Sequence, residues 1–451
     1  MLTNVECRGA IAALLMASLA PIAAAQESAP AEVPPAAEPA GLLPVPDYTG
    51  GLATRSRLSG DWGGSRTSLA NKGVMFDIDF TQIGQGVVSG GRRIDWDYHG
   101  SLDAGITLDL HRMNLLPGAL VRARAESRFG ETVNDDSGSL LPVNTDGFFP
   151  LTSPSNQSIA SVTELNYTQF LSPKFGLTLG KYQTLDGDPN EFASGRGRSQ
   201  FMNFNFIASG VSALTIPYST LGGGAVYMPT DRIVVSSILV STTDSSTTSG
   251  FEDLDEGFSW ITEADFQYKI GSLPGGTNVG FVYAFDGDFT QLGGKLQLGP
   301  GGVTLSSEGE SWSAFVSNWQ YVHLMDDAPA KIDLSNGRQD LRGIGLFSRL
   351  GFADQDTNPV EWSLSGGVGA RGLIAAREND TCGIAYVFSD FQNSGRLEPL
   401  GLEGSTQAAE LYYNVAITPA MGLTFDVQWV DSIVENVDEA WLLGARLDVR
   451  F

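Results

Sequence analysis

The sequence predicts an all-β protein, a transmembrane antiparallel β-barrel of 16 strands with short periplasmic turns and long extracellular loops. Most of the chain alternates apolar and polar residues with the period of two that is typical of half-buried strands. The connections between these segments mostly alternate between short and long, which is how outer-membrane barrels are organised. The 54 Gly, 24 Phe, 12 Tyr and 8 Trp also favour strands and turns.

Composition excludes several other classes of protein. The 451 residues include 27 Lys+Arg and 52 Asp+Glu, so the net charge of −25 argues against a nucleic-acid binder. Two Cys cannot build a disulfide framework or a Cys-rich zinc site. The mean hydropathy of −0.03 resembles that of a soluble protein, but a membrane barrel gives a similar average because half of each strand faces a polar interior.

The N-terminus has the pattern of a targeting segment. Residues 11–24 are an apolar run that ends in Ala23-Ala24-Ala25, which predicts a signal peptide over residues 1–25. Residues 26–54 contain repeated Pro among Ala and Glu, and we expect a semi-rigid periplasmic linker there that buries no core. No later apolar run reaches the roughly 18 residues that a spanning helix needs. Strands are therefore the expected way of crossing the membrane.

Residues 55–73 form a separate N-terminal segment. They contain the sequence Gly60-Asp61-Trp62-Gly63-Gly64, and the residues after it predict a short helix over 65–72. Gly73 is suited to end that helix in a left-handed conformation. The predicted transmembrane β-barrel then occupies residues 74–451.

Sixteen alternating segments make up the predicted barrel. In the first, the apolar residues Val74, Phe76 and Ile78 alternate with Asp77 and Asp79. Because neighbouring side chains on a strand point to opposite faces, one face of each strand is apolar and the other polar. We place the strands near 74–83, 99–110, 119–129, 161–171, 176–183, 222–228, 232–242, 258–269, 279–287, 310–322, 343–352, 360–370, 382–390, 409–417, 423–432 and 440–451.

The aromatic residues favour a membrane barrel over a soluble β-sandwich or propeller. In this topology Trp260, Trp362, Trp429 and Trp441 face outward near the long-loop rim, and Tyr268 and Phe451 face outward near the other rim. Two aromatic girdles around an apolar band match the two interfaces of a bilayer. A soluble sandwich also alternates, but it does not predict an apolar outer face on nearly every strand. The absence of a blade-length repeat argues against a propeller.

Several motifs, in this order, resemble the carbohydrate-selective (OprB-type) outer-membrane porin family. The resemblance spans roughly residues 58–451 and rests on the opening motif 60–66, the segments 343–349 and 372–380, Asn358-Pro359, 410–413 with Thr418-Pro419, and the terminal Phe451. It implies a sixteen-stranded porin of the Gram-negative outer membrane that lets monosaccharides and similar small polar solutes diffuse passively through a constricted, water-filled pore. The strong acidity departs from the family and keeps a general or cation-preferring diffusion porin as the alternative.

The third predicted strand carries the first candidates for solute contact. Alternation places Arg122, Arg124, Glu126 and Arg128 together on its inner face. A guanidinium can donate to two adjacent sugar hydroxyls, and a carboxylate can accept from them. The inner faces of the first two strands add Asp77 and Asp103. The alternative is that these charges pair across the barrel interior and only stiffen its wall.

The long segment 184–221 provides the remaining candidates. It contains Arg196 and Arg198, followed by Phe201 and Phe204. A loop of this length with its own apolar residues is expected to fold. Folding inward would narrow the pore and could offer an aromatic face to the C–H side of a pyranose. The alternative is a compact extracellular loop.

No enzyme, metal site or cofactor is predicted. The three His lie near strand ends and none stands beside a Ser in a recognised motif, while Cys382 is expected to pack. The acidic stretch 186–190 is rejected as a calcium loop because Glu191 stands where the required Gly belongs. The acidic run 252–256 could gather divalent cations with lipopolysaccharide, or be a solvated loop. The expected partners are small carbohydrates, outer-membrane lipid and lipopolysaccharide, and the barrel-assembly machinery through Phe451, with no nucleic acid.

Overall fold

The computed structural model describes residues 41–150, 159–185, 189–212, 215–292, 296–299, 302–325, 341–391 and 403–451. The predicted signal peptide and residues 26–40 of the predicted linker lie outside the described residues.

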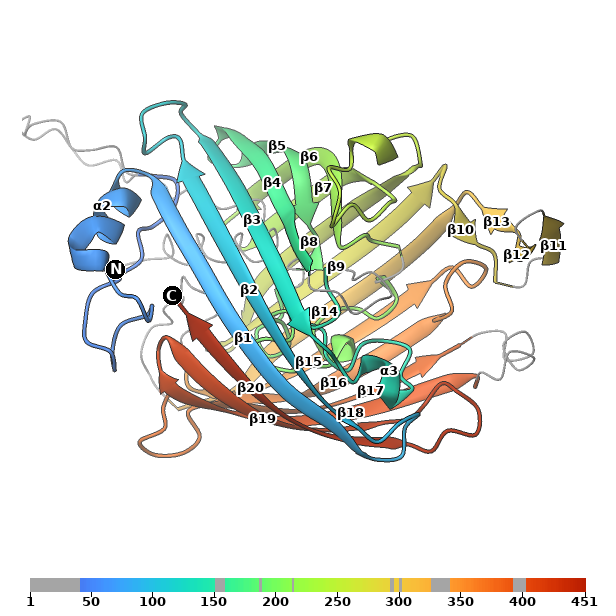
Figure 1. Cartoon of the computed structure of the whole chain (residues 1–451). Coiled ribbons are helices and arrows are strands. Elements are labelled where there is room, and N and C mark those ends of the chain that lie inside the picture. Colours follow the sequence, from blue (N-terminus) through green and yellow to red (C-terminus); the bar gives the residue numbers. More distant parts are fainter. Residues whose placement is uncertain are drawn as a thin grey trace, which may run out of the picture.

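The described chain forms a closed barrel of 16 antiparallel strands, which confirms the predicted fold class (Figure 1). The first strand pairs with both the second and the last, so the sheet has no free edge. In barrel order the strands are β1 (Val74–Ser89), β2 (Trp96–Asp109), β3 (Ala119–Gly130), β4 (Ile159–Ser172), β5 (Phe175–Gln183), β6 (Ser219–Thr230), β7 (Ile233–Ser241), β8 (Phe258–Ile270), β9 (Leu273–Phe285), β14 (Ser311–Leu324), β15 (Gly343–Ala353), β16 (Trp362–Arg371), β17 (Thr381–Asp390), β18 (Ser405–Thr418), β19 (Met421–Val430) and β20 (Ala440–Arg450).

Several strands are longer than the alternation predicts. β1 continues to Ser89 through Gly84 and Gly86, and β9 begins at Leu273, just before Pro274. Gly and Pro weaken the strand pattern locally, but pairing with both neighbours in the closed sheet overrides that preference. Four further strands form two small hairpins within the long segment after β9, namely β10 (Phe289–Thr290) with β13 (Ser307–Glu308), and β11 (Leu296–Gly299) with β12 (Gly302–Leu305).

The two rims of the barrel differ. Helix α2 and the C-terminus lie at one end, and the hairpins β10–β13 lie at the other (Figure 1). Connections at the α2 end are mostly tight turns, such as 173–174 and 419–420, although 325–342 and 372–380 are longer. Asp380 holds the second of these longer connections to the barrel, because it accepts from the Tyr413 hydroxyl at 2.6 Å and the Ala416 amide at 2.9 Å.

The outer face carries the predicted apolar residues. Trp260 and Trp441 are 44% and 49% exposed. Trp429 is the cross-strand partner of Trp441, and Trp362 is that of the exposed Phe352. Since cross-strand partners share a face, all four predicted tryptophans belong to the outer surface.

Within the described ranges, the helices given below are all short. The predicted helix over 65–72 is present as α2 (Ser65–Asn71), preceded by the 3₁₀ helix η1 (Trp62–Gly64). The others are α3 (Asn134–Ser137), η3 (Phe204–Phe206) and η5 (Phe251–Asp253). Within the described ranges, no helix has the length and apolar character needed to cross a bilayer.

Residues 41–54 differ from the predicted linker. Leu42 and Tyr48 are buried, at 4% and 1% exposure, against residues that belong to the barrel or to α2. Composition alone gave no reason to expect burial, because the apolar surface that covers these side chains comes from distant strands. Arg66 fastens α2 beside this segment, since its guanidinium lies 4.3 Å from the centre of the Tyr48 ring and donates to the backbone oxygens of Phe76 and Phe451.

Candidate solute site in the barrel interior

The described residues of the inner segment, 189–212 and 215–218, fold into the barrel, as the first of the two alternatives predicts. Near its start, the Asn190 side chain donates to the Ser317 hydroxyl of β14 at 3.1 Å. In its middle, the Met202 amide donates to the Glu410 carboxylate of β18 at 2.6 Å. These contacts join the segment to two different parts of the wall.

Two buried arginines of the wall hold the backbone of the same segment. Arg446 of β20 donates to the carbonyl oxygens of Gly197 at 2.6 Å and Gln200 at 2.7 Å. Arg349 of β15 donates to the carbonyl oxygen of Phe206 at 2.7 Å. An irregular buried segment needs such partners, because its backbone groups have no strand neighbour to pair with.

Apolar packing completes the attachment of the segment to the wall. The Phe192 ring lies against Trp319 and Tyr321, with centroids 6.4 Å and 4.8 Å away. A Cβ atom at Gly345 would lie 2.1 Å from the Phe192 ring, and one at Gly369 would lie 2.7 Å from the Phe192 side chain. These glycines therefore provide the space that lets the ring reach the wall.

The predicted role of Phe201 and Phe204 as a sugar-facing surface is wrong. Phe201 is 0% exposed and packs against Phe347 and Tyr412, and Phe204 is 3% exposed. Both rings belong to the packing between the inner segment and the barrel, where burial of their apolar area stabilises the segment and leaves no face for a solute.

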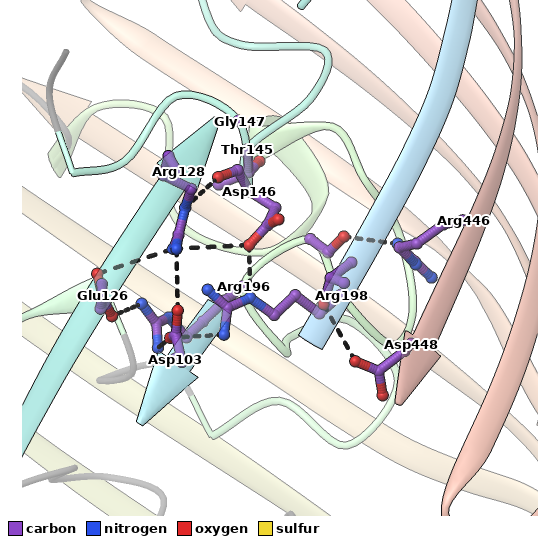
Figure 2. A network of polar contacts seen from close by, with 12 residues as sticks. Asp103, Glu126, Arg128, Thr145, Asp146, Gly147, Arg196, Arg198, Arg446 and Asp448 are labelled. Carbon is purple, nitrogen blue, oxygen red and sulfur yellow. Dashed lines mark hydrogen bonds and ion pairs between the residues drawn. The ribbon is translucent and has the colours of Figure 1, made fainter. Parts of the chain in front are cut away.

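Asp103 of β2 lies at the centre of an ionic network (Figure 2). Its carboxylate accepts from Arg128 at 2.9 Å, Arg196 at 3.1 Å and Arg198 at 2.6 Å. Arg128 comes from β3, while the other two arginines come from the inner segment. Residues that were predicted separately on two strands and one loop are therefore brought together.

Asp146, from the connection between β3 and β4, extends this network. Its carboxylate pairs with Arg198 and lies 3.1 Å from Nε2 of His99, and its carbonyl oxygen accepts from Arg128 at 2.7 Å. Burial alone would raise the pKa of Asp146, but the Arg198 and Arg128 guanidinium groups outweigh it and hold that pKa well below its usual value. The carboxylate therefore stays charged at neutral pH.

Glu126 connects the network to the end of the inner segment. It accepts from the Tyr218 hydroxyl at 2.6 Å and also pairs with Arg196. Three guanidinium groups thus face three carboxylates, those of Asp103, Glu126 and Asp146. These largely buried ion pairs join the inner segment to β2, β3 and the connection after β3, which is the pairing that the alternative interpretation expects.

Arg122 and Arg124 lie outside that network, on the same inner face of β3 but nearer its periplasmic end. Both are only partly buried. Arg124 keeps 22% of its side chain exposed and lies 3.4 Å from the Glu164 carboxylate of β4. Asp77 is also separate, because it pairs with Arg57 at 2.6 Å near the start of β1.

The sequence did not identify Asp146, His99, Tyr218 or Glu164. Asp146 and Tyr218 lie in irregular connections, where no periodicity indicates which way a side chain points. The inner face of β4 could have indicated Glu164, but the register shifts by one residue where this strand pairs with β3. Across the described ranges, no group of three or more His, Cys, Asp or Glu is arranged to hold a metal ion.

Comparison with known proteins agrees with this architecture. Residues 93–451 match the family described as carbohydrate-selective porin, OprB family. Porin B of Pseudomonas aeruginosa is 24% identical over 444 residues, covering 87% of this chain and 90% of that protein. The high-pH structure of Pseudomonas putida OprB has a TM-score of 0.74 at 21% identity, covering 88% of this chain and 99% of that one. The low-pH structure has a TM-score of 0.54 at 16% identity, with the same coverage. The chain therefore belongs to the carbohydrate-selective porins of the OprB family and is a sugar porin of the bacterial outer membrane.

Proposed function

We propose that monosaccharides and similar small polar solutes diffuse through the barrel past Arg122 and Arg124, which contact them directly. The observation that carries this proposal is exposure to the barrel interior. Arg128 and Arg198 are 3% and 8% exposed within the network. Arg122 and Arg124 are only partly buried on the inner face, and Arg124, which lies 3.4 Å from Glu164, keeps 22% of its side chain exposed.

The geometry of β3 suits a sugar ring. Residues two apart on one strand lie roughly 6–7 Å from each other on the same face, which is comparable to the span of a pyranose. Both guanidinium groups remain charged at physiological pH and present several N–H donors each. A sugar can therefore exchange hydrogen bonds with water for hydrogen bonds with the wall as it moves, without a step of tight binding.

The test is the double variant Arg122→Ala with Arg124→Ala. We expect slower sugar entry in a liposome-swelling assay and an unchanged or higher small-ion conductance, because truncation widens the path and removes positive charge. The matched control is Arg92→Ala with Arg93→Ala, which removes the same charge from exposed positions between β1 and β2. Sugar entry at the wild-type rate and with the wild-type ranking in the first variant would exclude this role.

A general or cation-preferring diffusion porin is the second candidate, and the net charge of −25 favours it. Excess carboxylates along a pore attract cations. Reversal potentials in a salt gradient separate the two candidates: strong cation preference without discrimination among sugars supports the general porin.

We further propose that the C-terminal Phe451 is recognised by the barrel-assembly machinery. Its support is the position of this residue directly after β20, with its amide donating to the Ile78 oxygen of β1 at 2.7 Å, so that it ends the strand that closes the barrel. The acidic run 252–256, which includes part of η5 at the long-loop rim, is proposed to meet lipopolysaccharide through divalent cations.

A further inference from the structure

The described N-terminal segment 41–58 begins against the inner wall of the periplasmic mouth. Its Leu42 is 4% exposed and belongs to an apolar cluster with residues of four barrel strands. The wall residues of this cluster are Leu120 of β3, Phe170 of β4, Val226 of β6 and Val234 of β7, and Leu43 packs against the cluster as well.

These wall residues face the barrel interior. Leu171, next to Phe170, is 62% exposed, and Tyr227, next to Val226, is 50% exposed. Because neighbours on a strand point to opposite faces, Phe170 and Val226 point inward. Apolar side chains on the water-facing side of a porin wall are unusual, and here the segment 41–58 covers them.

Polar contacts fasten the same stretch to β2 and its following turn. The Leu43 amide donates to the Asp109 carboxylate at 3.2 Å, and the Leu43 oxygen accepts from Arg112 at 2.5 Å. A Cβ atom at Gly41 would lie 2.2 Å from Arg112, so this guanidinium lies directly against the backbone.

The other end of the segment is fastened at the closing seam of the barrel. Arg57 is 5% exposed and pairs with Asp77 of β1 at 2.6 Å, and the Leu58 amide donates to the Arg450 oxygen of β20 at 2.6 Å. The segment therefore contacts residues of β20, β1, β2, β3, β4, β6 and β7.

We propose that this segment, which we call the strap (residues 41–58), is a second constriction that limits the size of solutes leaving the barrel. It lies next to the proposed sugar contacts, because Leu120, which it covers, is two residues from Arg122 on the same face of β3. The described part of the inner segment and the strap would then bound a chamber whose wall carries Arg122 and Arg124. The inference rests on the proposed function in that the permeating solute is a sugar.

The first test detaches the strap by a neutral substitution, Leu42→Asn. Placing an amide in the apolar cluster disfavours docking. Two constrictions in series add their resistances, so we expect a higher small-ion conductance, up to about twofold if the two resistances are equal, and faster entry of di- and trisaccharides relative to glucose. The matched control is Leu52→Asn, because Leu52 lies on the same segment but is 62% exposed. Faster migration of unheated samples on gels shows that each variant forms a barrel.

The second test locks the strap in place. A Leu42→Cys and Val226→Cys pair, in a Cys382→Ser background, places two thiols in one apolar cluster, where a short bifunctional thiol reagent can join them. The cross-linked protein should keep the wild-type conductance and size limit, because the link holds the strap on the wall. Folded barrels with equal conductance and equal size limit in the wild type, Leu42→Asn and the locked protein would overturn the proposal.

The two proposals can fail separately. If Leu42→Asn relaxes the size limit while the Arg122 and Arg124 variant transports sugars normally, the strap proposal is supported and the proposed arginine contact is rejected. If the arginine variant slows sugars while strap variants change nothing, the strap is only a structural attachment.

Discussion

At the scale of single residues, identical side chains on one strand have different environments. Arg122, Arg124 and Arg128 occupy the same face of β3 at intervals that alternation predicts. Arg128 is 3% exposed because the inner segment covers it and Asp103 and Asp146 pair with it. How far each arginine of this strand is buried thus depends on which part of the strand the inner segment covers.

Asp103 gives the sharpest test of the bracing role. In Asp103→Asn, three arginines lose the carboxylate that they share, and removing one partner of a buried ion pair costs about 3–5 kcal/mol. We expect a lower temperature of thermal unfolding and a higher, noisier single-channel conductance as the inner segment loosens. Differential scanning calorimetry and planar-bilayer recordings measure the two effects.

The matched control for this prediction is Asp95→Asn. Asp95 also pairs with an arginine, Arg93 at 3.5 Å, but both side chains are well exposed. Exposed pairs contribute little to stability because water screens them. If Asp103→Asn has the same unfolding temperature and the same conductance noise as Asp95→Asn, the network does not fasten the inner segment.

At the scale of elements, the C-terminal strand closes the barrel by pairing with β1. The end of this strand also makes a contact outside the sheet. The Phe451 oxygen accepts from Arg66 of α2 at 2.9 Å, so the strand end is also joined to the N-terminal segment. The backbone and the ring of Phe451 can therefore contribute separately to assembly and to stability.

We predict that deleting Phe451, and also replacing it by Phe451→Ala, strongly lowers the amount of folded barrel in the outer membrane. Phe451→Ala keeps the backbone contacts, so its loss of insertion reports the ring alone. Phe425→Ala is the control, because Phe425 is an outward aromatic of β19 that is 53% exposed. Heat-modifiable protein in outer-membrane fractions is the measurement. Wild-type levels of folded protein in both Phe451 variants would refute recognition of this residue.

At the scale of the whole molecule, closure of the sheet determines its behaviour in detergent. All 16 barrel strands pair on both sides, so backbone hydrogen bonds have no exposed edge at which unfolding could begin. The inner segment adds bonds to β14, β15, β18 and β20 from within.

We expect the purified protein to give a β-rich circular dichroism spectrum and to migrate faster on gels before heating than after it. Detergent replaces lipid at the outer face without opening the ladder of strand pairs. A helical spectrum, or a mature protein that stays in solution without detergent, would contradict the barrel.

The sequence by itself determined the barrel, its strand number and its faces, because period-two alternation is a local property that each strand carries in its own residues. It also placed Asp103, Glu126 and Arg128 on the inner wall. Only the tertiary structure decided that Asp146, Arg196, Arg198 and Tyr218 meet them, that Phe201 and Phe204 are buried, and that Leu42 lies against Leu120, Phe170, Val226 and Val234. These contacts join irregular segments to distant strands. Irregular backbone has no fixed period, so the direction of its side chains is set by the surface on which it packs.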